Sequence, residues 1–150
     1  MALTACKAAE RKLPFEVAPG VQQVGRITDP RITESSGVVA SRKYANIFWT
    51  HNDGGGPAKQ FLFAIHRAGD TVAAISVPGA LFKDWEDIAI DDSGHLFLGD
   101  IGNNDSKQQD IFVYQIDEPD PKAGVRSVEI QRQWRLRYPD KPVDAESLFV

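Results

Sequence analysis

Short apolar runs, each closed by a polar turn, fill most of this chain. Four of them lie at residues 36–40, 47–50, 61–65 and 71–77, and four more at 87–90, 95–98, 111–116 and 128–136. They are rich in β-branched and aromatic residues, which are typical of strands. No segment keeps the 3.6-residue apolar period of an amphipathic helix over ten residues. The pattern predicts an all-β chain.

The two sets of runs have the same internal order, and a glutamate precedes each set. Glu34 and Glu86 open the two sets, and Glu146 opens a third apolar run that continues to Val150. A repeat of about 50 to 60 residues with four strands is typical of the blades of a β-propeller. We therefore expect a β-propeller of four-stranded antiparallel blades, with two complete blades and the first strand of a third. A β-sandwich of the same strands is the alternative, but a sandwich would not require the repeat.

Both ends of the chain bear on its domain organisation. Residues 1–20 are expected to form a tether and residues 21–150 a partial β-propeller domain, in which the run 21–27 is an outer strand that closes the ring. A closed ring needs at least four blades. Val150 ends the chain inside an apolar run, whose edge would be left unpaired. The expectation is that this chain is the N-terminal part, or fragment, of a longer protein.

The single cysteine lies close to the N-terminus. Leu3-Thr4-Ala5-Cys6 resembles the bacterial lipobox, where a signal peptide is cut just before a lipid-modified cysteine. The apolar stretch that should come first is missing, since only Met1 and Ala2 precede the motif. Two explanations stay open: the start of the chain was set too late, or the match is accidental. Under the first, the full-length protein is a bacterial lipoprotein, held by a lipid anchor in the periplasm or at the cell surface.

Composition narrows the classes of partner. The chain is 42% hydrophobic and 25% charged, which is typical of a globular protein. A net charge of −4 gives no reason to expect nucleic acid or an anionic membrane as partner. No apolar stretch approaches the ~20 residues of a transmembrane helix. One cysteine excludes an intrachain disulfide framework.

Polar residues gather where the expected strands begin or end. In a propeller blade, the loop that enters the first strand and the loop that leaves the second lie on the same face. One mouth of the central channel should therefore collect these candidate ligand-binding residues: Glu34, His51, Asn52, Asp53, Trp85, Glu86, Asp87, Asp100, Asn103, Asn104 and Glu146. Five carboxylates among them are candidate metal ligands: Glu34, Asp53, Glu86, Asp100 and Glu146. Ca²⁺ is the candidate cofactor, because it takes six to eight oxygen ligands in irregular geometry.

Each candidate also has a structural interpretation. The repeated glutamates could cap backbone N–H groups of the neighbouring blade. Asp and Asn beside glycine commonly stabilise turns, as around Asp53 and Asp100. Trp85 suits packing within a blade as well as stacking on a ligand.

Several strings of the chain carry a family resemblance. The most specific are Trp85-Glu86-Asp87-Ile88-Ala89 and Asp100-Ile101-Gly102-Asn103-Asn104, within a similarity that spans roughly residues 25–150. The chain resembles a group of bacterial β-propellers described as NHL-like, SdiA-regulated-like or phytase-esterase-like. The resemblance implies a six-bladed ring. It implies no particular activity, because the group has no settled one.

Three functions stay open. The first is a binding or scaffold domain outside the cytoplasm, whose acidic mouth holds an unidentified ligand or partner protein, with Ca²⁺ as candidate ion. The second is a metal-dependent hydrolase of phytase, lactonase or esterase type, with Glu86 or Asp100 as candidate base. The third is an interaction platform without a small-molecule site. No Gly-x-Ser-x-Gly elbow is present, so binding is favoured and enzymatic activity stays undecided.

Overall fold

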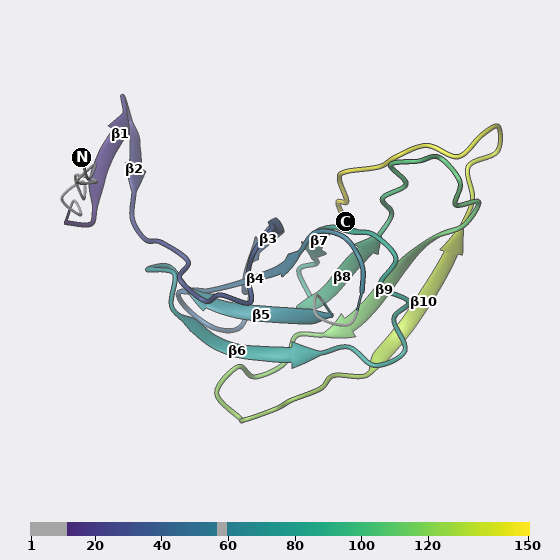
Figure 1. Ribbon diagram of the computed structural model, residues 1–150. Helices are drawn as coiled ribbons and strands as arrows, with labels where there is room; N and C mark the ends of the chain where they lie inside the picture. The colour runs from purple at the N-terminus through teal and green to yellow at the C-terminus, as the bar shows by residue number, and fades with distance from the viewer. Residues whose placement is uncertain (1–11, 57–59) are drawn as a thin grey trace, which may run out of the picture.

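Ten strands in three antiparallel sheets make up the protein (Figure 1). The computed structural model describes residues 12–56 and 60–150. No helix lies within these ranges, and so none that is long and apolar enough to cross a membrane. The prediction of an all-β chain is confirmed for this part of the sequence.

The smallest sheet is a hairpin of β1 (Phe15–Ala18) and β2 (Val21–Gln23). Its turn contains Gly20, whose φ of 74° favours glycine. The sequence analysis placed no strand in residues 1–20 and one strand over 21–27. The structure instead pairs a strand from each segment. A hairpin of adjacent strands satisfies both backbones locally, because it needs no distant partner.

Two four-stranded meanders follow, each in sequence order. Sheet I contains β3 (Ser35–Ala40), β4 (Ile47–Asn52), β5 (Phe61–His66) and β6 (Thr71–Ser76). Sheet II contains β7 (Trp85–Ile90), β8 (His95–Asp100), β9 (Ile111–Asp117) and β10 (Ile130–Leu136). All eight predicted runs of these two sets form strands. The prediction of repeated four-stranded antiparallel sheets is thereby confirmed.

The third apolar run does not form a strand. Residues 146–150 are extended, and a backbone hydrogen bond from Leu148 to the Asp87 carboxylate (2.8 Å) ties them to β7. A strand needs a ladder of backbone bonds to a neighbour, and no such ladder joins this segment to the described residues. The expected first strand of a third sheet is therefore only an extended segment beside β7.

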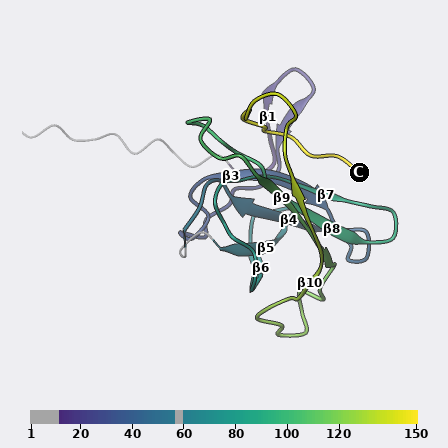
Figure 2. The same ribbon diagram turned by 90° about the vertical axis from the view of Figure 1, so that its right-hand side faces the viewer.

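The two large sheets pack against each other through apolar side chains. Sheet I contributes Trp49, Leu62 and Ile75, and sheet II contributes Leu96 and Tyr114, all fully buried. Their first strands, β3 and β7, are neighbours (Figures 1 and 2). A Cβ atom at residue 37 would overlap the Asp87 side chain, so glycine at Gly37 is what allows β3 and β7 to approach.

Strand register corrects the alignment of the repeat. Ser35 lies opposite Asn52 in sheet I, and Trp85 lies opposite Asp100 in sheet II, each just before a register shift. Glu86 therefore corresponds to Ser36, and Asp84 is the residue that corresponds to Glu34. The repeated glutamates Glu34 and Glu86 are two positions out of step, because the sequence alone does not show which residues pair.

Candidate functional site

Carboxylates from three parts of the chain meet at one end of the sheets. Asp53 follows β4, Asp84 and Glu86 lie at the start of β7, and Asp144 and Glu146 belong to the extended C-terminal segment. They form two groups that share Glu86, one with Asp53 and Asp84 and one with Asp144 and Glu146. In each group, one ligand oxygen of every residue lies within 4.8 Å of the others. We call these five residues the acidic cluster.

Glu86 is the centre of the acidic cluster. It is only 4% exposed, whereas Asp144 and Glu146 are exposed. Burial is the largest cause that raises the pKa of Glu86, followed by the negative charges of Asp53, Glu146 and Asp84. A hydrogen bond between the carboxyl groups of Glu86 and Glu146 raises it further, and the resulting pKa is about 8. Glu86 therefore carries a proton at neutral pH unless a cation replaces it.

The loop after β8 wraps around the acidic cluster. The backbone N–H of Gly102 donates to the carbonyl of Asp84 (3.1 Å), and that of Asn103 donates to the Asp144 carboxylate (2.5 Å). A Cβ atom at residue 102 would overlap the carboxylates of Glu86 and Asp84. Glycine at Gly102 is thus required for the backbone to lie this close to the carboxyl groups.

Asp100 is not part of the acidic cluster, although it was a predicted metal ligand and candidate base. One of its oxygens accepts backbone hydrogen bonds from Lys83 (3.0 Å) and Asp84 (2.7 Å), and the other accepts from the Tyr114 hydroxyl (3.3 Å). Burial raises the pKa of Asp100, while these hydrogen bonds act against the rise. Its place in the structure is that of a support for the loop that carries Asp84.

Asn52 occupies the corresponding place in sheet I. Its side-chain oxygen accepts from the backbone N–H groups of Thr33 (2.9 Å) and Glu34 (3.1 Å), and its amide donates to the carbonyl of Arg31 (2.7 Å). Both sheets thus use an Asx residue at the end of the second strand to hold the loop entering the first. Glu34 lies on that loop and belongs to neither carboxylate group.

Two further candidates, His51 and Trp85, lie in the core. His51 has no exposed surface, its Nδ1 lies 2.9 Å from the carbonyl of Asn52, and its ring meets the Trp85 ring edge to face at 5.5 Å. Burial lowers the pKa of His51, so it is neutral at pH 7. Trp85 also stacks on Phe82, with ring centroids 4.5 Å apart. Both side chains are packed in the core, and His51 Nε2 and Trp85 Nε1 are buried there without a hydrogen-bond partner among the described residues.

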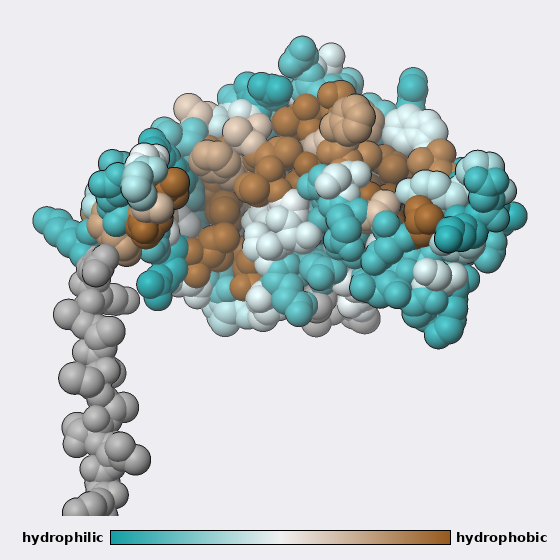
Figure 3. All heavy atoms as spheres, turned by 90° about the horizontal axis from the view of Figure 1, so that it is seen from above, coloured by the Kyte–Doolittle hydropathy of each residue, from teal (hydrophilic) through white to brown (hydrophobic). Residues whose placement is uncertain are grey.

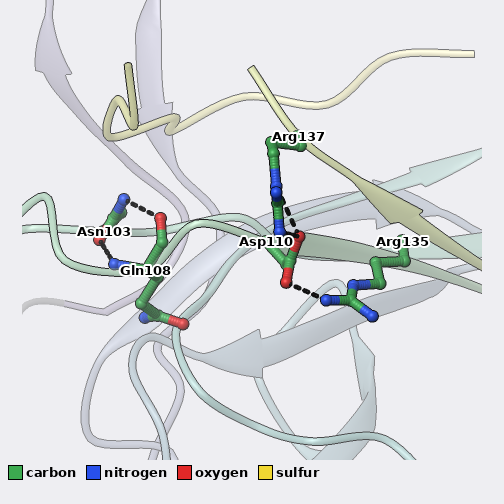
Figure 4. Close-up of polar contacts among 5 residues, drawn as sticks. All are labelled: Asn103, Gln108, Asp110, Arg135 and Arg137. Carbon is green, nitrogen blue, oxygen red and sulfur yellow. Dashed lines mark hydrogen bonds and ion pairs between the residues drawn. The ribbon is translucent and has the colours of Figure 1, made fainter. Parts of the chain in front are cut away.

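Asn103 organises the loop between β8 and β9 (Figure 4). Its side chain accepts from the backbone N–H of Gln108 and donates to the carbonyl of the same residue, both at 2.9 Å. At the end of that loop, Asp110 pairs with Arg135 and Arg137 of the β10 end, which lowers the pKa of the Asp110 carboxyl. These contacts fix the loop whose start, at Gly102, touches the acidic cluster.

Of the predicted candidates, Asp53, Glu86 and Glu146 belong to the acidic cluster. Asp87 and Asn104 lie beside it: Asp87 accepts a hydrogen bond from the Leu148 backbone, and the Asn104 amide is 3.5 Å from Asp84. The sequence analysis missed Asp84 and Asp144. Their signal was the repeated Asp-x-Glu of residues 84–86 and 144–146. Cys6, the candidate for lipidation, lies outside the described residues.

No neutralising cation is seen next to the acidic cluster within residues 12–56 and 60–150, since none of the ion pairs found there involves its five residues. Lys83, adjacent in sequence, is directed over the Phe112 ring, 5.3 Å from its centroid. The cluster is therefore a concentration of negative charge that a bound cation would relieve.

Comparisons with protein-family models, with curated proteins and with solved structures found no match for this chain.

Proposed function

We propose that the two sheets are consecutive blades of a β-propeller. Supporting this, both sheets have the same strand order, the same register shift near the start of the first strand, and the same Asx support at residues 52 and 100. The strands β3 and β7 and residues 148–150 together border a hollow of about 490 Å³. First strands that line a common hollow are what a propeller channel requires. Figure 3, which views the molecule from above, shows apolar residues gathered across the middle of the view.

We further propose that the protein is a binding domain whose acidic cluster holds a divalent cation at the channel mouth. The burial of Glu86 among four other carboxyl groups carries the proposal. Without a cation, burial and then the neighbouring negative charges make Glu86 keep a proton. A divalent ion would replace that proton and bind several oxygens at once. All candidate ligands are carboxylate oxygens, which suit Ca²⁺ or Mg²⁺ better than Zn²⁺ or Cu²⁺. Ca²⁺ is our first choice because the five residues come from three separate segments, and such a shell adapts to irregular geometry.

Thermal melts with Ca²⁺, with Mg²⁺ and with EDTA test the cation. At about 100 times its Kd, a bound ion should raise Tm by roughly 5 to 10 °C. Glu86→Gln should abolish the shift, because it removes a ligand charge shared by both carboxylate groups. Asp92→Asn is the matched control: Asp92 is a fully exposed acid in the turn between β7 and β8, and its loss should leave the shift unchanged. A wild-type Tm that is equal in Ca²⁺, Mg²⁺ and EDTA would contradict the proposal.

One observation also favours the hydrolase. A carboxyl group with a pKa of about 8 is matched to general acid or base work near neutral pH, and Glu86 is such a group. Turnover of aryl esters, lactones and phosphomonoesters with Ca²⁺ present would test it. Activity lost in Glu86→Gln and kept in Asp92→Asn would support the enzyme; inactivity towards the whole panel would leave the binding domain. The location outside the cytoplasm stays a prediction that depends on Cys6.

A further inference from the structure

Residues 22–31 run from the end of β2 towards β3 and cross the face of sheet I that points away from sheet II (Figure 1). Beneath them, Phe63 and Ile65 are 0% and 7% exposed. The Arg31 guanidinium lies over the Phe63 ring, 5.6 Å from its centroid. Val38 of β3 is on the same face and is 57% exposed, so this part of β3 is left uncovered. We call residues 22–31 the cover segment.

The cover segment interlocks with the turn between β5 and β6. The Arg26 backbone N–H donates to the carbonyl of Ala68 (3.0 Å). A Cβ atom at residue 25 would overlap the Ala68 backbone, and one at residue 69 would overlap the Arg26 backbone. Gly69 also has a φ of 101°, which favours glycine. Glycines at Gly25 and Gly69 thus let the two backbones touch, and this contact holds the cover segment in place on sheet I.

A hollow of about 440 Å³ remains between the cover segment and sheet I. Val38, Phe48 and Ile65 of sheet I form its apolar floor, and residues 22–27 form the opposite wall. Phe48 pairs with Ile65 across β4 and β5, so both side chains lie on the covered face. A hollow of this size, with a largely apolar lining and a few polar groups, is typical of small-molecule sites. Because both walls are held in place, no rearrangement is needed before a ligand binds.

The titratable groups that border this hollow are Arg26, Arg67 and His66, and none of them is acidic. Both arginines are exposed, and neither belongs to an ion pair found in residues 12–56 and 60–150. The whole chain, in contrast, has a net charge of −4. A cationic border on an acidic protein favours an anionic ligand. Guanidinium groups suit a carboxylate in particular, because they can donate two parallel hydrogen bonds to it.

We propose that this hollow binds a small carboxylate with an apolar body. The apolar part lies on the floor formed by Val38, Phe48 and Ile65, and the carboxylate faces the two arginines. None of the residues that border the hollow belongs to the acidic cluster. The proposal therefore goes beyond the cation site proposed above and does not depend on it.

NMR titrations in EDTA test the site with probes that share one apolar chain. Octanoate is the anion, 1-octanol is the neutral probe and octylammonium is the cation. Octanoate should bind with a Kd of about 1 mM or less, and octylammonium should bind at least about 10-fold more weakly. The amide signals of Gly25 and Gly69, which border the hollow, should shift with octanoate. The signal of Gly124, in the loop between β9 and β10, should stay unchanged.

Substitutions at exposed residues test the two parts of the site. The double variant Arg26→Gln, Arg67→Gln should weaken octanoate binding at least about 10-fold and leave 1-octanol binding unchanged, because it removes only charge. Val38→Asp places a like charge beside the carboxylate, so it should weaken octanoate binding more than Val38→Asn does. Arg132→Gln, at an exposed residue of β10, is the matched control and should bind octanoate like the wild type. All four residues are exposed, so the variants should keep the native melting curve.

Three results would overturn the proposal. The first is the absence of any shift at Gly25 and Gly69 up to about 10 mM octanoate, where a site of millimolar Kd would be filled. The second is equal affinity for octanoate and octylammonium, which would mean that the hollow does not select anions. The third is unchanged octanoate binding in the double arginine variant. Because EDTA is present throughout, these results do not depend on a cation at the acidic cluster, which the Tm shift with Ca²⁺ tests separately.

Discussion

Asn52 and Asp100 occupy the same place in two successive sheets, and each accepts two backbone hydrogen bonds from the loop that enters its own first strand. Both are buried, at 1% and 3% exposed. An amide in one sheet and a carboxylate in the other thus perform the same structural task. The task requires a side-chain oxygen at this position, and it does not require a charge.

This equivalence predicts how sheet II responds to substitution at residue 100. Asp100→Asn keeps the accepting oxygen and removes a buried charge, so the free energy of unfolding should change by less than about 1 kcal/mol. Asp100→Ala leaves the backbone N–H groups of Lys83 and Asp84 without their acceptor and should cost about 2 to 4 kcal/mol. Urea unfolding of both variants measures the difference. Equal losses would show that the charge of Asp100 matters and that the comparison with Asn52 fails.

The raised pKa of Glu86 predicts that stability without metal falls as pH rises. The ordinary pKa of a glutamate, 4.5, applies to the unfolded chain, and the folded value is about 8. Between these values the folded protein binds more protons than the unfolded one, so the free energy of unfolding decreases with increasing pH. Urea titrations in EDTA at pH 5, 6.5 and 8 should show this slope. Glu86→Gln has no proton to lose, so its slope should be clearly smaller.

The affinity for Ca²⁺ should have the opposite pH dependence and increase as pH rises. At neutral pH an incoming Ca²⁺ displaces the Glu86 proton, so the apparent affinity should increase up to about pH 8 and then level off. Calorimetry in two buffers with different ionisation enthalpies counts the released protons. About one proton per ion is expected below pH 7. A buffer-independent heat would mean that Glu86 is not a ligand.

A substitution at Gly102 tests the acidic cluster without removing any of its carboxylates. In Gly102→Ala, the added methyl group overlaps the Glu86 and Asp84 carboxylates, so the loop or the carboxyl groups must shift. We expect Ca²⁺ affinity to fall at least about 10-fold, since ligand placement is displaced. Glu86→Ala makes room for the methyl group, so Gly102→Ala should destabilise that variant less than it destabilises the wild type. An equal loss of stability from Gly102→Ala in both backgrounds would show that the methyl group is accommodated elsewhere.

A buried contact between the sheets gives a prediction far from the acidic cluster. The Trp49 indole donates to a Glu118 oxygen at 2.7 Å, and the other oxygen of this carboxylate is buried without a partner among the described residues. Glu118→Gln keeps an acceptor and removes the charge, so it should be neutral or stabilising. Glu118→Ala leaves the indole N–H unpaired and should cost about 1 to 3 kcal/mol. Thermal melts of the two variants measure the difference. A decrease in Tm for Glu118→Gln as large as that for Glu118→Ala would mean that the charge itself is needed.

The strands are the part of the fold that could be predicted most fully from the sequence. Apolar runs between polar turns locate all eight strands of the two large sheets, because a strand with a buried face needs such residues in any context. The chain end behaves differently. The run from Glu146 to Val150 has the composition of a strand and remains without a ladder, because a strand exists only with a partner.

The sequence by itself determined the repeated four-stranded antiparallel sheets. It predicted Asp53, Glu86 and Glu146 at one end of them, together with Glu34 and Asp100, which do not join the acidic cluster. Only the tertiary structure decided which acids form the acidic cluster. Asp100 looks like a ligand in the sequence, yet its oxygens accept from Lys83, Asp84 and Tyr114. Asp84 was not a candidate in the sequence analysis, yet register and the close approach of Gly102 place it beside Glu86. The physical reason is that a hydrogen-bonding or ligand role depends on which backbone groups lie within about 3 Å, and that is set by pairing across the sheets.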